Sequence, residues 1–96
     1  MTLEEALAGL RQCRDRIDDV DRRLIELLNE RAQVAEQIGR LKQGQALPIY
    51  EPKREDQVFA NVMRQNTGPL SHDAAKRIFE RVIDEMRRLQ KERMQG

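Results

Sequence analysis

Apolar residues recur along the first half of the chain at intervals of three, four or seven residues, and the first 47 residues contain no proline. Such intervals keep apolar side chains on one face of an α-helix, so the pattern predicts one long helix over residues 3–43. Thr2 and Glu5 have the spacing of a capping box, which fits a helix start at about residue 3. The apolar stripe of this helix consists of Leu3, Leu7, Leu10, Ile17, Leu24, Leu28, Ala35 and Ile38.

Two shorter helices are predicted in the second half of the chain. Pro52 fits the first turn of a helix over residues 52–65, because a missing N–H costs nothing there. The turn-forming residues 66–69 end that helix, and Ser71 is expected to cap a third helix that ends near Arg93. No segment alternates like a β-strand. The sequence therefore predicts an all-α fold of one long, one short and one medium helix in a single domain over residues 1–96.

The length of the first helix has a consequence for assembly. About 40 helical residues span roughly 60 Å, whereas a compact globule of this chain length has a radius of gyration of only about 12–13 Å. Two helices of about 14 and 22 residues cannot cover an apolar stripe of that length. We therefore expect a second copy of the chain to cover it, in an intertwined homodimer.

Composition and charge exclude several classes of protein. The 18 Lys+Arg against 17 Asp+Glu leave a formal net charge of +1, which argues against a nucleic-acid binder. No apolar run approaches the roughly 20 residues that a membrane span needs, and the N-terminus lacks the pattern of a signal peptide. The single Cys13 excludes an internal disulfide and a cysteine zinc site. We expect a cytoplasmic protein that binds neither nucleic acid, membrane nor metal.

Three cations lie on or beside the apolar stripe of the long helix. Arg31 continues the heptad series of Leu24 and Ile38, and Lys42 and Arg14 occupy the neighbouring series. One such side chain alone is explained by snorkelling or by pairing with an acid. Three together, with no matching set of carboxylates on the stripe beyond Asp21, indicate a bound anion, because a buried charge without a partner is costly.

The spacing of these cations suggests how they divide between two sites. Arg31 and Lys42 are eleven residues apart, so they point about 20° apart and lie roughly 16 Å apart along the helix. Arg14 precedes Arg31 by seventeen residues, or roughly 25 Å. Within an antiparallel dimer, Arg14 is therefore expected to serve the site of the partner subunit, which predicts two composite sites per dimer.

The two shorter helices add polar groups near the predicted core. Glu55 shares a helix face with Val58 and Phe59, with Arg54 beside it, although acids in a first turn also simply complement the helix dipole. Gln90 continues the buried stripe of the third helix, or else lies on a fraying end. No nucleophile–base pair is present. The set predicts binding and electrostatic stabilisation rather than covalent catalysis.

In this order and spacing, four segments resemble the all-helical chorismate mutases, the AroQ class, and the resemblance covers about residues 5–92. These segments are Leu10–Arg14 leading to Ile17 and Asp21, Leu27–Arg31, Ile38–Lys42 and Pro52–Glu55. The resemblance implies an intertwined helical dimer. It also implies an isomerase of aromatic amino acid biosynthesis, which converts chorismate to prephenate by a Claisen rearrangement without metal or cofactor.

The resemblance also implies roles for individual residues. Arg31, together with Arg14 of the partner subunit, would bind the two carboxylates of the substrate, which suits the planar fork of a guanidinium. Arg54 would support the carboxylate side. Lys42 would contact a substrate carboxylate and the ether oxygen of the breaking bond, where negative charge develops, and Gln90 would donate a second hydrogen bond to that oxygen.

Glu55 would accept a hydrogen bond from the ring hydroxyl, and Glu51 would line that side of the pocket. Two positions depart from the pattern of the family. Glu51 stands where many relatives have Asp, which is chemically equivalent. Met86 stands where some relatives have a Ser that contacts a carboxylate, and a thioether cannot donate that hydrogen bond.

Three other functions compete with this one. An isochorismate-pyruvate lyase shares the fold and the cationic clamp, but the pair Arg54 and Glu55 favours the mutase. A mutase-like domain associated with another shikimate-pathway enzyme, which senses prephenate or chorismate, is the second. A purely structural helical dimer is the third, and it predicts no turnover of chorismate.

Overall fold

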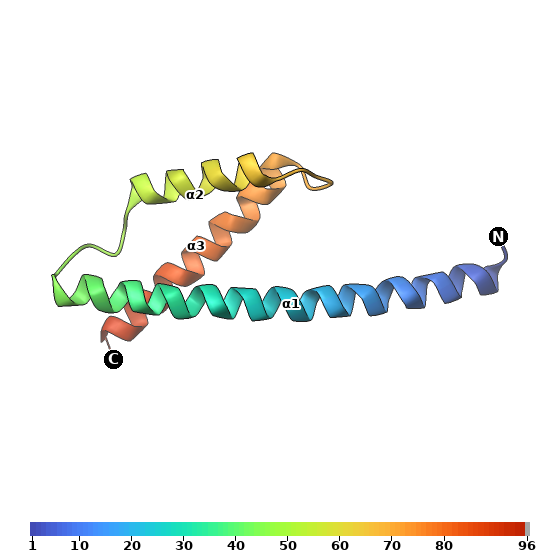
Figure 1. Cartoon of the computed structure of the whole chain (residues 1–96), viewed down its shortest axis with the longest axis horizontal. Coiled ribbons are helices and arrows are strands. Elements are labelled where there is room, and N and C mark those ends of the chain that lie inside the picture. The colour runs from blue at the N-terminus through green and yellow to red at the C-terminus, as the bar shows by residue number, and fades with distance from the viewer. Residues whose placement is uncertain (96) are drawn as a thin grey trace. The chain divides into compact units, whose positions relative to one another are not determined.

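The computed structural model describes residues 1–95 as three α-helices in the order α1 (Leu3–Gly44), α2 (Pro52–Gln65) and α3 (His72–Gln95) (Figure 1). The described residues contain no strand, so the all-α prediction is confirmed. The helix ends lie within two residues of those predicted. Contacts divide the chain into two compact units, Met1–Arg31 and a second that begins at Ala32. None of the described helices combines the length and the apolar character that crossing a membrane requires.

The first unit is the amino-terminal part of α1. The Thr2 side-chain oxygen accepts a hydrogen bond from the backbone N–H of Glu5 at 3.1 Å, which confirms the predicted N-cap. Glu4 and Glu5 lie in the first turn, where their charges complement the helix dipole. The start of α1 is thus determined by residues within one turn of each other.

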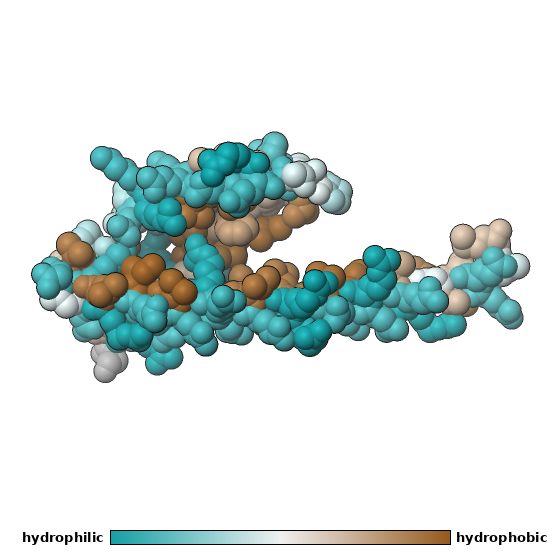
Figure 2. Space-filling model, in the orientation of Figure 1, coloured by the Kyte–Doolittle hydropathy of each residue, from teal (hydrophilic) through white to brown (hydrophobic). Residues whose placement is uncertain are grey.

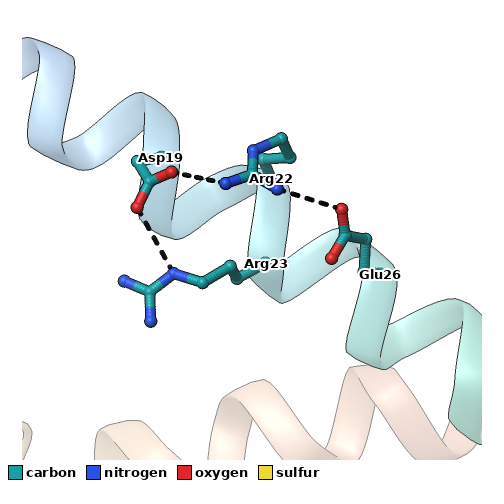
Figure 3. Close-up of polar contacts among 4 residues, drawn as sticks. All are labelled: Asp19, Arg22, Arg23 and Glu26. Carbon is teal, nitrogen blue, oxygen red and sulfur yellow. Dashed lines mark hydrogen bonds and ion pairs between the residues drawn. The ribbon is translucent and has the colours of Figure 1, made fainter.

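One face of this unit carries ion pairs within the helix (Figure 3). Asp19 lies between two guanidinium groups, at 2.6 Å from Arg22 and 3.5 Å from Arg23, and Arg22 also contacts Glu26 at 3.3 Å. All four side chains are more than half exposed. Exposed pairs of this kind contribute only about 0.3–0.5 kcal/mol each. This charge cluster therefore stabilises a solvated face of α1 and does not mark a site.

The apolar face of this unit is exposed in the single chain. Leu10, Ile17 and Leu24 keep 47%, 57% and 52% of their surface accessible. Figure 2 shows apolar side chains along the surface of α1. A continuous apolar surface of this kind marks an interaction site. In the single chain, the apolar surface that the sequence assigns to contact with a second copy is therefore uncovered.

In the second unit, α2 and α3 pack against each other after a short turn (Figure 1). The Asn66 side chain donates to the Leu70 carbonyl at 2.9 Å and accepts from the Gly68 N–H at 3.3 Å, which closes that turn. Ser71 accepts a hydrogen bond from the Ala74 N–H at 3.0 Å, so the predicted cap of α3 is confirmed. These local hydrogen bonds determine where α2 ends and α3 begins.

The last turns of α1 belong to the same unit and pack closely against α3. A Cβ added at Gly39 would lie 3.4 Å from the Cγ of Gln90, an ordinary van der Waals distance, so the Gln90 side chain packs directly against this turn of α1. Arg93 forms an ion pair with Glu36 at 2.7 Å across the same contact. Ala35, Ala75 and Ile83 are the buried apolar residues of the described chain. This contact places Gln90 and Arg93 of α3 against the last turns of α1.

Candidate functional site

Lys42 lies in the last turn of α1 and is buried, with 7% of its surface exposed. The chain turns back after α1, with the Leu47 N–H donating to the Lys42 carbonyl at 2.8 Å. This turn places two acceptors at the ammonium, the Ile49 carbonyl at 3.0 Å and the Glu51 carboxylate at 2.8 Å. A buried ammonium is tolerated only with such partners. Among the described residues these two contacts use two of its three N–H donors, which leaves one for a ligand.

Gln90 of α3 is also buried, with 8% of its surface exposed. Its side-chain amide donates to the Ala35 carbonyl at 3.0 Å. Ala35, Gly39 and Lys42 are spaced four and three residues apart and are the buried residues of α1, so they share one helix face. The predicted position of Gln90 near the core is confirmed. Its amide has a second N–H, and it lies along the helix face that carries Lys42.

Glu55 lies in the first turn of α2 and contacts α3 through an ion pair. Its Oε2 accepts a hydrogen bond from Nη2 of Arg87 at 2.6 Å, and the two side chains are 21% and 27% exposed. The carboxylate has two oxygens and further lone pairs, so it can accept a second hydrogen bond from a ligand hydroxyl. The first-turn position of Glu55 is thus used for a contact between helices as well as for the helix dipole.

Arg87 is the residue of this neighbourhood that the sequence analysis missed. It lies four residues after Ile83 and three before Gln90, so it continues the buried stripe of α3. A cation on an apolar stripe is the signal that singled out Arg31, and the same test applied to α3 would have found Arg87. Its guanidinium carbon lies 5.0 Å from the centre of the Tyr50 ring.

None of the other predicted site residues is fully buried. Arg54 is exposed and donates to Gln57 of its own helix at 3.4 Å, while Met86 is half-buried on α3. Arg14 and Arg31 lie on α1 in the first unit, Arg14 exposed and Arg31 half-buried. The second unit by itself contains Lys42, Glu51, Glu55, Met86 and Gln90, and its contacts join Lys42 to Glu51, Glu55 to Arg87 and Gln90 to Ala35.

The second unit thus holds a buried ammonium, a buried amide and two carboxylates that each pair with a cation. The ammonium and the amide can each donate one more hydrogen bond to an anionic or developing negative oxygen. A paired carboxylate can accept from a hydroxyl. Within residues 1–95, His, Cys, Asp and Glu form no group of three or more that could hold a metal ion. Together these groups can recognise a small anion that also carries a hydroxyl.

Comparison with known proteins connects this arrangement to one family. The family described as chorismate mutase type II matches residues 13–91. A bifunctional chorismate mutase/prephenate dehydratase of Pseudomonas aeruginosa is 37% identical over 79 residues, which are 77% of this chain and 22% of that protein. The chain therefore spans about a fifth of the length of this curated relative.

Solved structures of similar length share the fold. A chorismate mutase of Thermus thermophilus (form II) superposes with a TM-score of 0.85 at 30% identity, covering 86% of this chain and 94% of that one. A chorismate mutase of Helicobacter pylori in complex with prephenate gives a TM-score of 0.86 at 27% identity, covering 93% and 97%. Both likenesses extend over almost the whole of the compared chains.

Proposed function

Because the chain belongs to the chorismate mutase type II family, we propose that it rearranges chorismate to prephenate. The observation that carries this proposal is the buried ammonium of Lys42 on the α1 face against which Gln90 packs. Each of these groups keeps one N–H for a ligand. The solved relative bound to prephenate supports the same class of ligand.

The reaction is an isomerisation within one molecule. The ether C–O bond breaks while a new C–C bond forms, and no atom or proton enters or leaves. Negative charge develops on the ether oxygen, and donors held in place for that charge lower the barrier. We assign these donors to Lys42 and Gln90. Glu55 accepts a hydrogen bond from the ring hydroxyl, and Glu51, which contacts the ammonium of Lys42 at 2.8 Å, lines the same side.

The carboxylates of the substrate are assigned to arginines. Arg31 binds one of them from the same chain, Arg14 of the partner subunit binds the other, and Arg54 supports them. Bidentate guanidinium–carboxylate contacts hold the flexible substrate in its compact reactive conformer, and such positioning can supply much of the rate enhancement. Met86 contributes apolar contact where a hydroxyl would donate a hydrogen bond.

The homodimer is part of this proposal, because a site with Arg14 is complete only with a second chain. The exposed stripe through Leu10, Ile17 and Leu24 supports it. We predict that sedimentation at micromolar concentration gives twice the 11.3 kDa mass of one chain. Leu24→Glu should yield monomers, because it places a charge in the interface without a partner. Arg23→Glu, on the exposed polar face, is the control that should stay dimeric. A monomeric mass for the unchanged chain would contradict the assignment.

A product assay tests the proposed reaction. Incubation with chorismate should yield prephenate, and incubation with isochorismate should release no pyruvate. Pyruvate released from isochorismate would instead identify an isochorismate-pyruvate lyase. If neither compound is turned over, the result would indicate a purely structural helical dimer. The assay therefore assigns the chain to one of three classes by chemical identification of products.

The architecture of the relatives suggests a partner of the same pathway. In the Pseudomonas aeruginosa relative the matched part is about a fifth of a bifunctional protein with prephenate dehydratase in its name. We propose that this chain also works beside a further shikimate-pathway enzyme in the cytoplasm, where the free, exposed Cys13 would stay reduced. A rate of prephenate formation that rises when the second enzyme is added would support this association.

A further inference from the structure

Arg87 is a half-buried cation in the candidate site for which the proposed reaction so far supplies no role. Its Nη2 donates to Glu55 at 2.6 Å and lies 3.8 Å from Asp84 of its own helix. The Glu55 contact is the shorter, and Glu55 is 21% exposed while Asp84 is 54% exposed. Charge interactions strengthen as exposure to water falls, so Glu55 is the principal partner. The ion pair joins α2 to α3.

The guanidinium of Arg87 is held on two sides. Its edge faces the Glu55 carboxylate, and its carbon lies 5.0 Å from the centre of the Tyr50 ring, within the range of a cation–π interaction. Tyr50 lies in the segment that also carries the two partners of Lys42, Ile49 and Glu51. Residues 49–51 therefore contact both the guanidinium of Arg87 and the ammonium of Lys42.

The position of Arg87 also carries a cost. Its Nε is buried and has no hydrogen-bond partner among the described residues. A buried donor left without a partner destabilises the fold, and the ion pair itself, with side chains 27% and 21% exposed, is partly screened by water. Stability alone therefore explains the pair poorly, whereas a requirement for an oriented carboxylate explains it directly.

We propose that Arg87 is a positioning residue that holds the Glu55 carboxylate toward the ring hydroxyl of the substrate. The bond from Arg87 occupies Oε2, and the other lone pairs of the carboxylate remain for the hydroxyl. This role rests on the proposed function, because it assigns to Glu55 the hydroxyl of chorismate. Arg87 acts through Glu55 and does not itself contact the reacting atoms.

A double-mutant cycle with chorismate tests this role. Arg87→Met is expected to lower kcat/KM about tenfold, because a misplaced contact group reduces the population of reactive complexes. With Glu55→Gln already present, the same change should alter kcat/KM by less than about twofold, since the charge that Arg87 holds is gone. Arg81→Met is the matched control: Arg81 contacts Glu85 at 3.1 Å on the exposed face of α3, and kcat/KM should stay within about twofold.

Two results would overturn the proposal. An unchanged kcat/KM for Arg87→Met would remove the role, and an equal loss with and without Glu55→Gln would show that Arg87 acts independently of Glu55. If Arg87→Met fails to fold, the same cycle is run with Arg87→Lys, which keeps the charge but not the planar fork. Absence of turnover by the unchanged chain would remove the proposed function and this role together, whereas turnover that Arg87→Met leaves intact removes only the role of Arg87.

Discussion

Replacing Lys42 with alanine is expected to lower kcat for chorismate at least about 10²-fold, because a lost donor to a developing oxyanion is worth roughly 3 kcal/mol or more. Lys42 is buried and has only the Ile49 carbonyl and the Glu51 carboxylate as partners among the described residues, so its third N–H is the donor at stake. The disappearance of chorismate and the appearance of prephenate measure kcat. The effect should fall on kcat more than on KM, since the charge on the oxygen is larger in the transition state than in the substrate.

The Lys42→Ala variant needs a control, because it also removes an ion pair. Loss of the pair with Glu51 could loosen the segment after α1, so thermal unfolding and the dimer mass should be measured alongside kcat. Lys91→Ala removes an exposed ammonium from α3 next to Gln90 and should leave kcat within about twofold. A kcat near that of the unchanged protein, with intact folding, would exclude Lys42 from the donor role.

Replacing Arg14 with alanine is expected to lower kcat/KM for chorismate by about 10- to 10²-fold, because a charge-assisted bond to a carboxylate is worth roughly 1.5–3 kcal/mol. Arg14 is exposed in the single chain, where its loss should affect folding little. A large loss of activity with an unchanged melting temperature would therefore indicate that the side chain acts in the assembled dimer. An unchanged kcat/KM would place Arg14 outside the site.

Mixing two inactive variants distinguishes a shared site from a site within one chain. In a dimer of one Arg14→Ala chain and one Lys42→Ala chain, one site carries both substitutions and the other carries neither, because Arg14 serves the site of the partner subunit. With random exchange half of the dimers are mixed, so about a quarter of the original activity should return.

The matched control mixes Lys42→Ala with Arg31→Ala. If Arg31 and Lys42 serve the same site from one chain, each site of the mixed dimer keeps one lesion and no activity should return. Native mass spectrometry can verify that the subunits have exchanged. Recovery in the control, or none in the first mixture after verified exchange, would contradict the proposed division of the site.

Much of the candidate site could be predicted because its residues interrupt a local pattern. Arg31 and Lys42 stand out as cations on an apolar stripe, and Gln90 as an amide on another, and such departures are visible within two or three helical turns of sequence. Burial of Lys42 and Gln90 agrees with that prediction. Arg87 obeys the same criterion, because it lies on the stripe of Ile83 and Gln90, although the adjacent Arg88 is exposed.

The partners of these residues could not be predicted in the same way. The bond from Arg87 to Glu55 joins positions 32 residues apart, and the bond from Gln90 to Ala35 joins positions 55 apart. Such contacts depend on where helices cross, which side-chain spacing along one helix does not contain. The turn after α1 likewise places the Glu51 carboxylate beside the Lys42 ammonium, although the Glu51 side chain stays half exposed.

The sequence by itself determined the three helices, their caps, the apolar stripe of α1 and the expectation of a second copy. The physical reason is that helix periodicity and capping act over one to two turns, so they can be read from neighbouring residues. Only the tertiary structure decided which polar groups meet: the buried ammonium with Glu51, the amide of Gln90 on α1, and Arg87 with Glu55. These contacts arise from the packing of α3 against α2 and against the turn of α1 at Gly39, and from the turn before α2.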